Sequence, residues 1–411
     1  MDRPAILGGD PVTRKSIPFT RIYISDEEIK AVKDVLRSRI FVNGPYTEEL
    51  EREFAKYIGA KHAIAVSNGT DALFLSYIAL GIGYGDRVAT TPITFIATVS
   101  TIIHVGSVPV FCDVDVDSNL NPCEIPTRTE GLKAIVPVHL YGKPARMDEV
   151  VRIARENELY VIEDAAQAHG AVFAGKKVGL WGDVATFSFY PSKIIPAAGW
   201  GGIIVTNNDE IAERLRLLRA HGELRVLEGA KGAYEYIRLG YNMRISEIEA
   251  AVALCQLGRI ERYIGERRRI ARIFNEELSK LPGIVTPTED PGMRHVYYIY
   301  SILVDPSEIG WDRDSFVEAL NREGVDARRG YHTPIYKTQL FRRINDPRIN
   351  HLARIQKYPD YSKIYLENAE AVARRTVWLP IFPGMGDDEV EAVLRSVKKL
   401  VEWGRRRRKG Q

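Results

Sequence analysis

Between residues 62 and 112 the chain alternates short apolar runs with longer helix-like segments, and this alternation constrains the fold more than any other feature. We expect strands at 63–66, 87–91 and 108–112 and helices at 70–80 and 95–104. Parallel strands need a long crossover connection, and a helix is the usual one. The pattern therefore predicts a doubly wound, mostly parallel sheet covered by helices.

Two carboxylates, Glu163 and Asp164, follow the later apolar run 160–162. Open α/β sheets bind ligands at the carboxyl ends of their strands, so Asp164 is a candidate site residue from its position alone. A further strand-like run, 185–189, ends in a turn with a proline that cannot continue a sheet. This turn places Lys193 just beyond a strand end.

Five residues around Lys193 are aromatic, aliphatic or proline. They are Phe187, Phe189, Tyr190, Pro191 and Ile194. Loss of water around an ammonium group lowers its pKa and frees the amine to attack a carbonyl carbon, whereas a solvated surface lysine would have no such role. A lysine that can form a Schiff base and a carboxylate that can pair with a pyridine nitrogen are what pyridoxal phosphate requires of a protein.

The turn 67–71, Ser-Asn-Gly-Thr-Asp, joins the first expected strand to the next helix. Gly69 lets the backbone approach a ligand, and the free N–H groups at a helix start attract anions. The turn is therefore a candidate phosphate site, although Gly-Thr also occurs as an ordinary helix N-cap. It lacks the GxGxxG pattern that a nicotinamide-dependent enzyme would need.

Three motifs carry a resemblance to a known family: DAAQ at 164–167, FSFYPSK at 187–193 and GYNMR at 240–244. With them the chain resembles the DegT/DnrJ/EryC1/StrS sugar aminotransferases, a branch of the fold-type I pyridoxal phosphate enzymes, over nearly its whole length. The resemblance implies an α/β fold with a large, doubly wound, mostly parallel sheet of the seven-stranded type and a smaller α+β C-terminal domain.

A chain of 411 residues is too long for one compact core. We expect a large domain at 1–260, which includes an extended N-terminal arm at 1–24, and a small domain at 261–411. The charged segment 223–238 is expected to be a surface excursion near the site.

A net charge of +3 does not indicate binding to nucleic acid or to an anionic membrane. The chain has no apolar stretch of membrane-spanning length, and its first residues lack the apolar core of a signal peptide. These features predict a cytoplasmic protein. The three cysteines are odd in number and lack metal-ligand spacing, so we expect neither disulfides nor a metal site. For His139 and His169 we expect structural hydrogen bonding rather than a metal.

The resemblance implies a role for each candidate residue. Lys193 would hold pyridoxal phosphate as a Schiff base and, once displaced by the amino donor, move the substrate proton. Asp164 would pair with the ring nitrogen and stay ionised. The other implied contacts are Gly69, Thr70, Asp71 and Ser188 at the phosphate, Gln167 at the ring hydroxyl, Ala166 and Phe95 on opposite ring faces, Asn242 at the phosphate of a partner subunit, and Tyr190, His332 and Tyr336 at the substrate.

The resemblance further implies a homodimer with shared active sites and pyridoxamine phosphate as the intermediate cofactor form. The expected reaction moves an amino group from an amino acid, L-glutamate in the first instance, to a keto group of a nucleotide-linked sugar. The alternative is a cyclitol aminotransferase that acts on a scyllo-inosose-type ketone with glutamine. The segments LGGDPV at 7–12 and YHTPIYKTQLF at 331–341 resemble that branch.

Two further alternatives differ in chemistry. A non-catalytic sensor that kept the fold is expected to have lost Lys193 or Asp164, and the chain retains both. A sugar dehydratase of the same family carries histidine in place of the Schiff-base lysine, and the presence of Lys193 argues against it.

Overall fold

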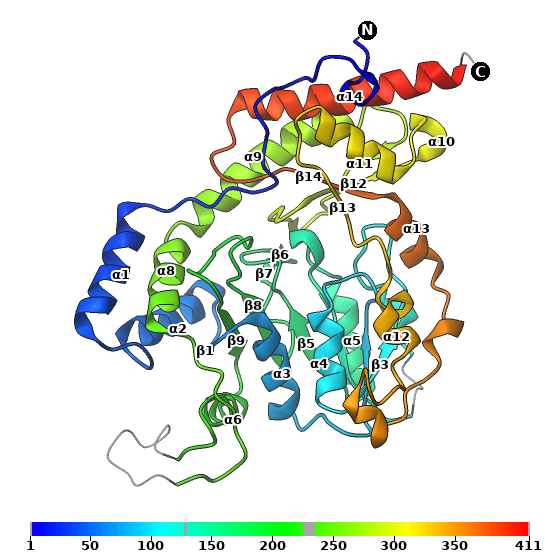
Figure 1. The fold of residues 1–411 in the computed structure, drawn as a ribbon. Coiled ribbons are helices and arrows are strands. Elements are labelled where there is room, and N and C mark those ends of the chain that lie inside the picture. The colour runs from blue at the N-terminus through cyan, green and yellow to red at the C-terminus, as the bar shows by residue number, and fades with distance from the viewer. Residues whose placement is uncertain (1, 127–129, 225–234, 410–411) are drawn as a thin grey trace.

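The computed structural model describes residues 2–126, 130–224 and 235–409 (Figure 1). Most of the expected surface excursion at 223–238 therefore lies outside the described residues. A large α/β layer forms the lower half of the molecule in Figure 1, and a smaller unit containing the last helix lies above it.

The large unit is built on a seven-stranded sheet with the order β1-β9-β8-β5-β4-β2-β3. The strands are β1 (His62–Val66), β2 (Arg87–Thr90), β3 (Val108–Phe111), β4 (Leu132–Val136), β5 (Tyr160–Asp164), β8 (Val184–Ser188) and β9 (Gly202–Thr206). Strand β9 is antiparallel to both neighbours, whereas the other pairings are parallel. The predicted mostly parallel, doubly wound sheet is confirmed.

Helices cover both faces of this sheet, because successive residues of a buried strand point to opposite faces and both must be packed. On one face α3 (Gly69–Ala79), α4 (Ala97–His104) and α6 (Asp209–Arg219) pack against Ile64, Ile162 and Ile204. On the other face α2 (Pro45–Ile58), α5 (Met147–Glu156) and α8 (Glu247–Leu257) pack against residues such as Ala65, Val161 and Phe187.

Helix α1 (Asp26–Ser38) lies against α8, at the left edge of Figure 1. Both helices begin with a capping box. In each, the N-cap serine (Ser25 and Ser246) accepts a backbone hydrogen bond from the first turn, and a glutamate (Glu28 and Glu249) accepts one from the serine backbone. A serine followed three residues later by a glutamate is the sequence pattern of such a helix start.

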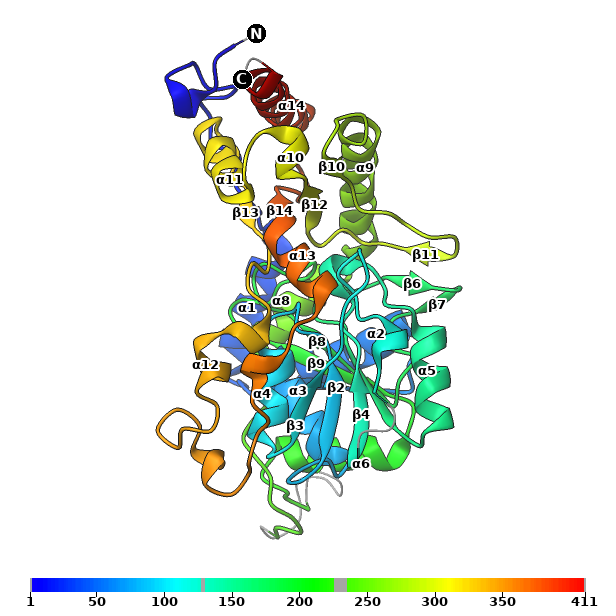
Figure 2. The same ribbon diagram turned by 90° about the vertical axis from the view of Figure 1, so that its right-hand side faces the viewer.

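The smaller unit is an antiparallel α+β layer, seen edge-on in Figure 2. Its sheet has the order β10-β12-β14-β13, from β10 (Ile284–Val285), β12 (Tyr300–Val304), β13 (Arg328–Arg329) and β14 (Thr376–Leu379). The surrounding helices are α9 (Ile260–Leu278), α10 (Pro306–Ile309), α11 (Arg313–Arg322), α13 (Glu367–Arg375) and α14 (Asp387–Lys409). The α+β character expected for the C-terminal part is confirmed.

A small sheet lies between the two units. It is made of β6 (Val172–Phe173), β7 (Lys176–Lys177) and β11 (Met293–Arg294), in the order β11-β6-β7. The short helices are η1 (Ala5–Leu7), η2 (Pro122–Glu124), η3 (Leu140–Gly142), η4 (Ile335–Lys337), α12 (Gln339–Arg342), η5 (His351–Arg354) and η6 (Tyr361–Lys363). The segment from η4 to η6 packs on α4 and β3 of the large unit.

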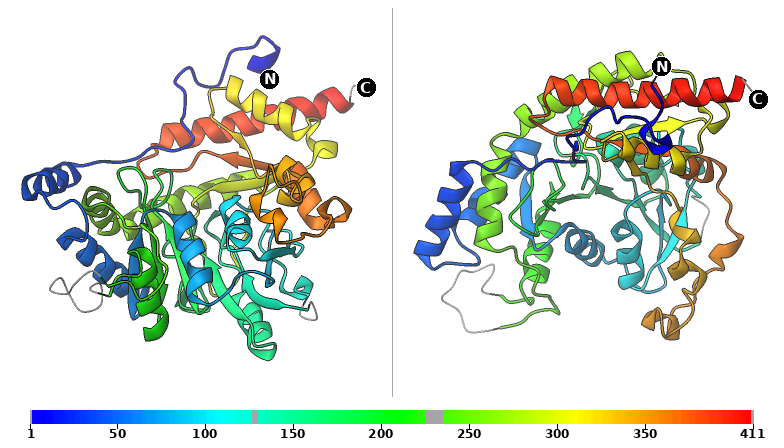
Figure 3. Two further views of the ribbon diagram at one scale, coloured as in Figure 1. Left: turned by 60° about the horizontal axis from the view of Figure 1, so that its bottom comes forward. Right: turned by 45° about the horizontal axis from the view of Figure 1, so that its top comes forward.

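The N-terminal arm runs across the small unit of its own chain (Figure 3). The backbone N–H groups of Ala5 and Val12 donate to the carboxylate of Glu323, and Ile17 forms a bridge with Val325. The arm is thus anchored within one chain. Among the described residues, no helix combines the length and apolar character needed to cross a membrane.

Candidate active site

The candidate residues of the central motifs meet at the carboxyl ends of two neighbouring strands. Asp164 ends β5 and pairs with Thr186 of β8, and Ser188 ends β8. The chain then folds into a turn in which the Lys193 N–H donates to the Tyr190 carbonyl at 2.8 Å. The structure therefore brings Asp164, Ser188 and Lys193 to the sheet edge that the sequence predicted.

Asp164 is 5 % exposed and has few hydrogen-bond donors. Thr98 Oγ1 donates to Oδ2 at 2.7 Å, and the Ala166 N–H donates to Oδ1 at 3.2 Å. Burial raises the pKa of Asp164, although these donors and the charge of Lys193 act in the opposite direction. A neighbouring cation would stabilise the ionised form of this buried carboxyl. Asp164 therefore fits a position facing the protonated ring nitrogen of pyridoxal phosphate.

Lys193 is half-buried, and its ammonium lies 4.7 Å from the centre of the Tyr298 ring. The Tyr298 hydroxyl lies 3.0 Å from Ser192 Oγ, and its carbonyl accepts a hydrogen bond from the buried Arg267 of α9. Among the described residues, no carboxylate forms an ion pair with Lys193. The amine is therefore held by an aromatic face and stays free of a fixed salt bridge.

The start of α3 forms a cradle beside Ser188. Asn68 caps the helix by accepting the Asp71 N–H at 2.9 Å. A Cβ at Gly69 would lie 2.8 Å from the Ser188 Cβ, and one at Gly202 would lie 2.5 Å from the Asn68 carbonyl. Glycine at both positions lets the helix start approach the sheet closely, which suits a phosphate at the helix N-terminus.

The side chain of Asp71 has another function in this cradle. Its carboxylate accepts hydrogen bonds from the Ser67 hydroxyl and from the Asn68 amide at 2.8 Å. A carboxylate and a phosphate repel each other, so the expected direct phosphate contact of Asp71 does not fit this geometry. Asp71 instead fixes the turn that presents Gly69 and Thr70.

Gln167 links the candidate site to the small unit. Its Oε1 accepts the Tyr141 N–H at 2.8 Å, and its Nε2 donates to the Tyr331 hydroxyl at 3.0 Å. Tyr331 was not a candidate, and it lies between β13 and η4 in the C-terminal part. Phe95, two residues before α4, is 58 % exposed, which leaves its ring free to stack on a ligand.

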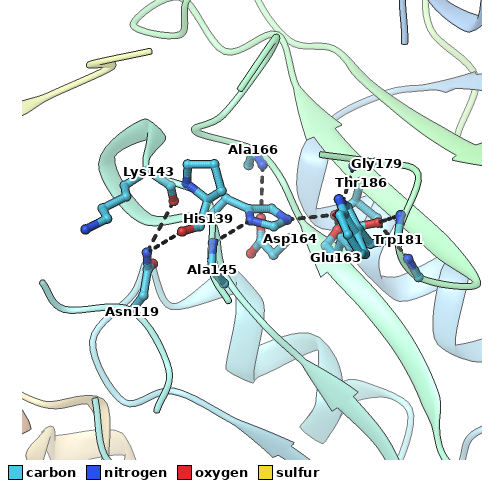
Figure 4. Close-up of polar contacts among 12 residues, drawn as sticks. Asn119, His139, Lys143, Ala145, Glu163, Asp164, Ala166, Gly179, Trp181 and Thr186 are labelled. Atoms are coloured by element: carbon cyan, nitrogen blue, oxygen red, sulfur yellow. Dashed lines mark hydrogen bonds and ion pairs between the residues drawn. The ribbon is translucent and has the colours of Figure 1, made fainter. Parts of the chain in front are cut away.

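Glu163 points to the face of β5 opposite to Asp164 and lies in a saturated hydrogen-bond network (Figure 4). Its carboxylate accepts the N–H groups of Gly179, Trp181 and Gly182 and a hydrogen bond from His139 Nε2. His139 Nδ1 accepts the Ala145 N–H at 3.0 Å, so the proton lies on Nε2. The structural hydrogen bonding expected for His139 is confirmed.

His169 lies in a different environment. It is fully buried among aromatic rings, including Phe54, Phe187 and Phe189. The Ser188 backbone is a weak hydrogen-bond partner of the ring, so the hydrogen bonding expected for this histidine stays a prediction. Burial lowers the pKa of His169 to about 3, with a further contribution from the Lys193 charge, and keeps the ring neutral.

The remaining candidates differ in exposure. Asn242, Tyr190 and His332 are exposed, and Asn242 Oδ1 accepts a hydrogen bond from Arg244 at 2.9 Å. Tyr336 is only 1 % exposed, packs in the cluster of α4, β3 and η6, and donates its hydroxyl to Glu370 at 3.0 Å. The expected substrate contact of Tyr336 does not fit this buried position.

Sequence reasoning missed Thr98, Tyr298 and Tyr331. For Thr98 a signal was available, because Thr94 and Thr98 lie one helical turn apart, with their hydroxyls 2.9 Å from each other, after the strand that precedes α4. For Tyr298 and Tyr331 the sequence holds no local signal, since the partners of their hydroxyls, Ser192 and Gln167, are more than a hundred residues away.

Comparisons with known proteins agree with one another. Residues 23–398 match the model of the DegT/DnrJ/EryC1/StrS aminotransferase family. The chain is 36% identical over 361 residues to GDP-perosamine synthase of Caulobacter vibrioides, which covers 87% of this chain and 91% of that protein. The match spans most of both proteins, so it is not confined to one motif.

Two solved structures share the fold. DesI, determined in the presence of its TDP-sugar product, superposes with a TM-score of 0.85 at 28% identity over 98% of this chain and 97% of that chain. NtdA from Bacillus subtilis, with bound pyridoxamine phosphate, superposes with a TM-score of 0.81 at 26% identity over 95% of this chain and 86% of that chain.

Proposed function

Because the chain belongs to the DegT/DnrJ/EryC1/StrS aminotransferase family, and is thus a pyridoxal phosphate-dependent transaminase, we propose that it transfers an amino group from L-glutamate to a keto group of a nucleotide-linked sugar. The observation that carries the proposal is the buried Asp164 carboxylate, which lies at one sheet edge with Lys193 and the start of α3. These are the three features a pyridoxal phosphate site needs: an acid for the ring nitrogen, an amine and an anion cradle.

In this proposal some residues hold the cofactor and others take part in the reaction. The helix start at Gly69 and Thr70, with Ser188 beside it, binds the phosphate, and Gln167, Ala166 and Phe95 orient the ring. When bound, the cofactor supplies an electron sink for the electrons left at the substrate Cα after proton removal. Thr98 and the Ala166 N–H hold the Asp164 carboxylate in place.

Lys193 acts first as the covalent attachment point and later as the base that removes the Cα proton. The absence of an ion pair at its Nζ among the described residues leaves the amine available for both roles. Asp164 keeps its negative charge once a cation lies against it, because an opposite charge at contact distance lowers the pKa that burial has raised.

The nucleotide-sugar acceptor is supported by two relatives. One is named a GDP-perosamine synthase, and the structure of another was determined with its TDP-sugar product. The test is single-turnover kinetics of the purified holoenzyme, loaded in the amino form with glutamate or glutamine and then mixed with keto sugars carrying different nucleotides. Return of the visible cofactor spectrum with a nucleotide-linked ketone supports the proposal. Reaction with scyllo-inosose and glutamine, and with no nucleotide sugar, would assign the cyclitol branch instead.

We further propose a homodimer whose two sites each receive Asn242 from the other chain. Apolar side chains, each more than a third exposed, gather in the segments 22–24, 40–42 and 236–241. They are Ile22, Tyr23, Ile24, Ile40, Phe41, Val42, Tyr236, Ile237, Leu239 and Tyr241. A monomer seldom leaves so many large apolar groups in water, and a two-fold interface would cover them twice.

Subunit mixing tests the shared site. Lys193→Ala and Asn242→Ala chains are each inactive or impaired alone, and a heterodimer carries both lesions in one site and neither in the other. Activity should partly return when the two proteins exchange subunits. Demonstrated exchange without recovery would place Asn242 in the site of its own chain.

A further inference from the structure

Tyr298, which lies between β11 and β12, contacts the turn that carries Lys193. The Lys193 Nζ lies over the Tyr298 ring, 4.7 Å from its centre, and the Tyr298 hydroxyl lies 3.0 Å from Ser192 Oγ. The first distance is within the range of a cation–π contact, about 6 Å. One tyrosine therefore meets two neighbouring residues of the turn, one with the face of its ring and one with its hydroxyl.

The backbone around Tyr298 is held from two sides. On one side, Arg267 of α9 donates through Nη1 to the carbonyls of Tyr297 and Tyr298, at 3.2 and 3.1 Å. On the other side, the Ile299 N–H donates to the Tyr141 carbonyl of η3 at 3.3 Å. These contacts with the two units fix the position of the ring beside the candidate site.

Arg267 is itself fixed by this arrangement. It is 3 % exposed, and the Ile381 carbonyl is a third acceptor for the same Nη1, at 2.8 Å. Burial lowers the pKa of Arg267 to about 10, so the guanidinium keeps its charge at neutral pH. A buried charge is costly unless hydrogen bonds satisfy it, so the guanidinium and its three carbonyls stabilise one another.

A cation–π contact acts on Lys193 only while its side chain carries a positive charge. The negative face of the ring attracts an ammonium group, whereas a neutral amine has no charge for it to attract. The negative charge of Asp164 also acts on Lys193. In the proposed function, however, that carboxylate faces the ring nitrogen of the cofactor, which leaves the Tyr298 ring to hold the ammonium.

The proposed reaction includes a state in which Lys193 is an ammonium. Lys193 takes the Cα proton of the donor, while the electron pair of the C–H bond passes to the cofactor. The ammonium then gives this proton to C4′ of the cofactor, where the electron pair forms the new C–H bond, and the amine is neutral again. Between the two transfers, the proton must be kept from exchange with water.

We propose that Tyr298 is a positioning residue of this reaction, whose ring holds the Lys193 ammonium between removal of the Cα proton and its delivery to C4′. The inference rests on the proposed function, in which Lys193 is the base. The hydroxyl contact with Ser192 keeps the ring aligned with the turn, and Arg267 fixes the backbone that carries the ring.

Isotope transfer in one half-reaction tests the proposal. The holoenzyme is converted to its amino form in ordinary water with 2-deuterated L-glutamate or L-glutamine, and mass spectrometry measures the deuterium at C4′ of the cofactor. The wild type should carry over a measurable share. Tyr298→Leu should reduce this share severalfold, because an ammonium without its aromatic face exchanges with water. Tyr298→Phe keeps the face and should retain the share.

A fluorinated series at residue 298 keeps the shape of the ring and changes its charge distribution. Phenylalanine with an increasing number of ring fluorine atoms has a progressively weaker negative face. The share of transferred deuterium should therefore fall as fluorine atoms are added. A purely structural role of Tyr298 would give the same share throughout the series.

The contact itself is tested in the cofactor-free protein by a double-mutant cycle. Lys193→Met, Tyr298→Leu and the double variant are unfolded with urea. The two changes should be coupled by about twofold to fivefold in the unfolding equilibrium constant. Lys176→Met combined with Tyr298→Leu is the matched control and should be additive, because Lys176 lies over Trp181 instead, at 4.8 Å.

The proposal is overturned if the wild type carries over no deuterium, if Tyr298→Leu retains the wild-type share, or if Tyr298→Phe loses as much as Tyr298→Leu. A constant share along the fluorinated series, or an additive cycle, would overturn it as well. Any of these results with normal conversion by the donor leaves the proposed function intact. If neither donor converts the holoenzyme, the proposed function fails and this inference fails with it.

Discussion

Glu163 and Asp164 are consecutive residues of one strand, both nearly inaccessible to water, yet the two faces of β5 treat them in opposite ways. The Glu163 carboxylate accepts hydrogen bonds from three backbone N–H groups and His139, whereas the Asp164 carboxylate accepts two from the described residues. Burial alone would raise the pKa of both carboxyls. The pKa of Glu163 is nevertheless lowered, because its donors outweigh burial, whereas that of Asp164 remains raised.

Within this single dipeptide, one carboxylate has a structural role and the other is available for chemistry. A buried carboxylate with a full set of donors is already stabilised as an anion and has little left to offer a ligand. A buried carboxylate with too few donors still lacks a partner, and a cationic ligand can be that partner. The Glu163 face is therefore expected to control stability, and the Asp164 face, which also carries Lys193, is expected to control activity.

The largest expected effect lies on the Asp164 face. Lys193→Ala should lower turnover about a thousandfold or more, because it removes both the attachment point and the base. The fold should be unchanged, since no ion pair of this side chain is present in the described structure. Borohydride should remove the visible band of the wild-type holoenzyme and leave a label on Lys193.

Lys176→Ala is the matched control for this variant. Lys176 also lies over an aromatic ring, that of Trp181 at 4.8 Å, but on the small sheet between the units. Its replacement should leave turnover and labelling unchanged. Normal transamination by Lys193→Ala would refute the assignment of the Schiff-base lysine.

The second effect lies on the Glu163 face. Glu163→Gln keeps the shape but places an amide NH₂ against at least one of the four donors, so a buried donor loses its acceptor. We expect the free energy of unfolding to fall by about 3 kcal/mol, measured by urea denaturation. Glu156→Gln, at a glutamate whose side chain is 56 % exposed on α5, should change it by less than about 0.5 kcal/mol.

The isosteric change on the other face should give the reverse pattern. Asp164→Asn removes the negative charge facing the cofactor, and we expect the rate of the half-reaction with an amino donor to fall roughly tenfold to two-hundredfold. The cofactor-free variant should be at least as stable as the wild type at neutral pH, because it no longer buries an incompletely paired charge. Equal rates for both proteins would mean that another group protonates the ring.

The alternation of apolar runs was sufficient to predict the sheet, the helices that cover it and the strand end that carries Asp164. These features depend on local periodicity and on a general rule for where parallel strands place ligands. The capping boxes at Ser25 and Ser246 were predictable for the same reason, since all their partners lie within one helical turn.

The contacts that distinguish Glu163 from Asp164 could not be predicted in this way. The sequence shows two adjacent acids, and only the fold brings the Gly179–Gly182 turn to one and Thr98 to the other. Tyr336 shows the opposite case, in which the sequence suggests a site residue that the fold buries. Its motif resembles a substrate-binding segment, but the packing of η4 on β3 buries its ring.

The smallest expected effect, and the sharpest test of the comparison, is the pH dependence of stability in the cofactor-free protein. Glu163 has a lowered folded pKa, so its contribution is present above the ordinary carboxyl pKa and is lost as the pH falls through the folded value. Asp164 has a raised folded pKa, so its ionisation opposes folding above that value, and the penalty disappears as the pH falls below the ordinary one.

Urea denaturation of the wild type, Glu163→Gln and Asp164→Asn between about pH 3 and pH 7 should therefore give slopes of opposite sign. The stability advantage of the wild type over Glu163→Gln should shrink as the pH falls. Over the same range the wild type should gain stability relative to Asp164→Asn, with changes on the order of 1 kcal/mol. Slopes of the same sign would show that the two carboxyls share one environment, and the separation of a structural face from a reactive face would then be wrong.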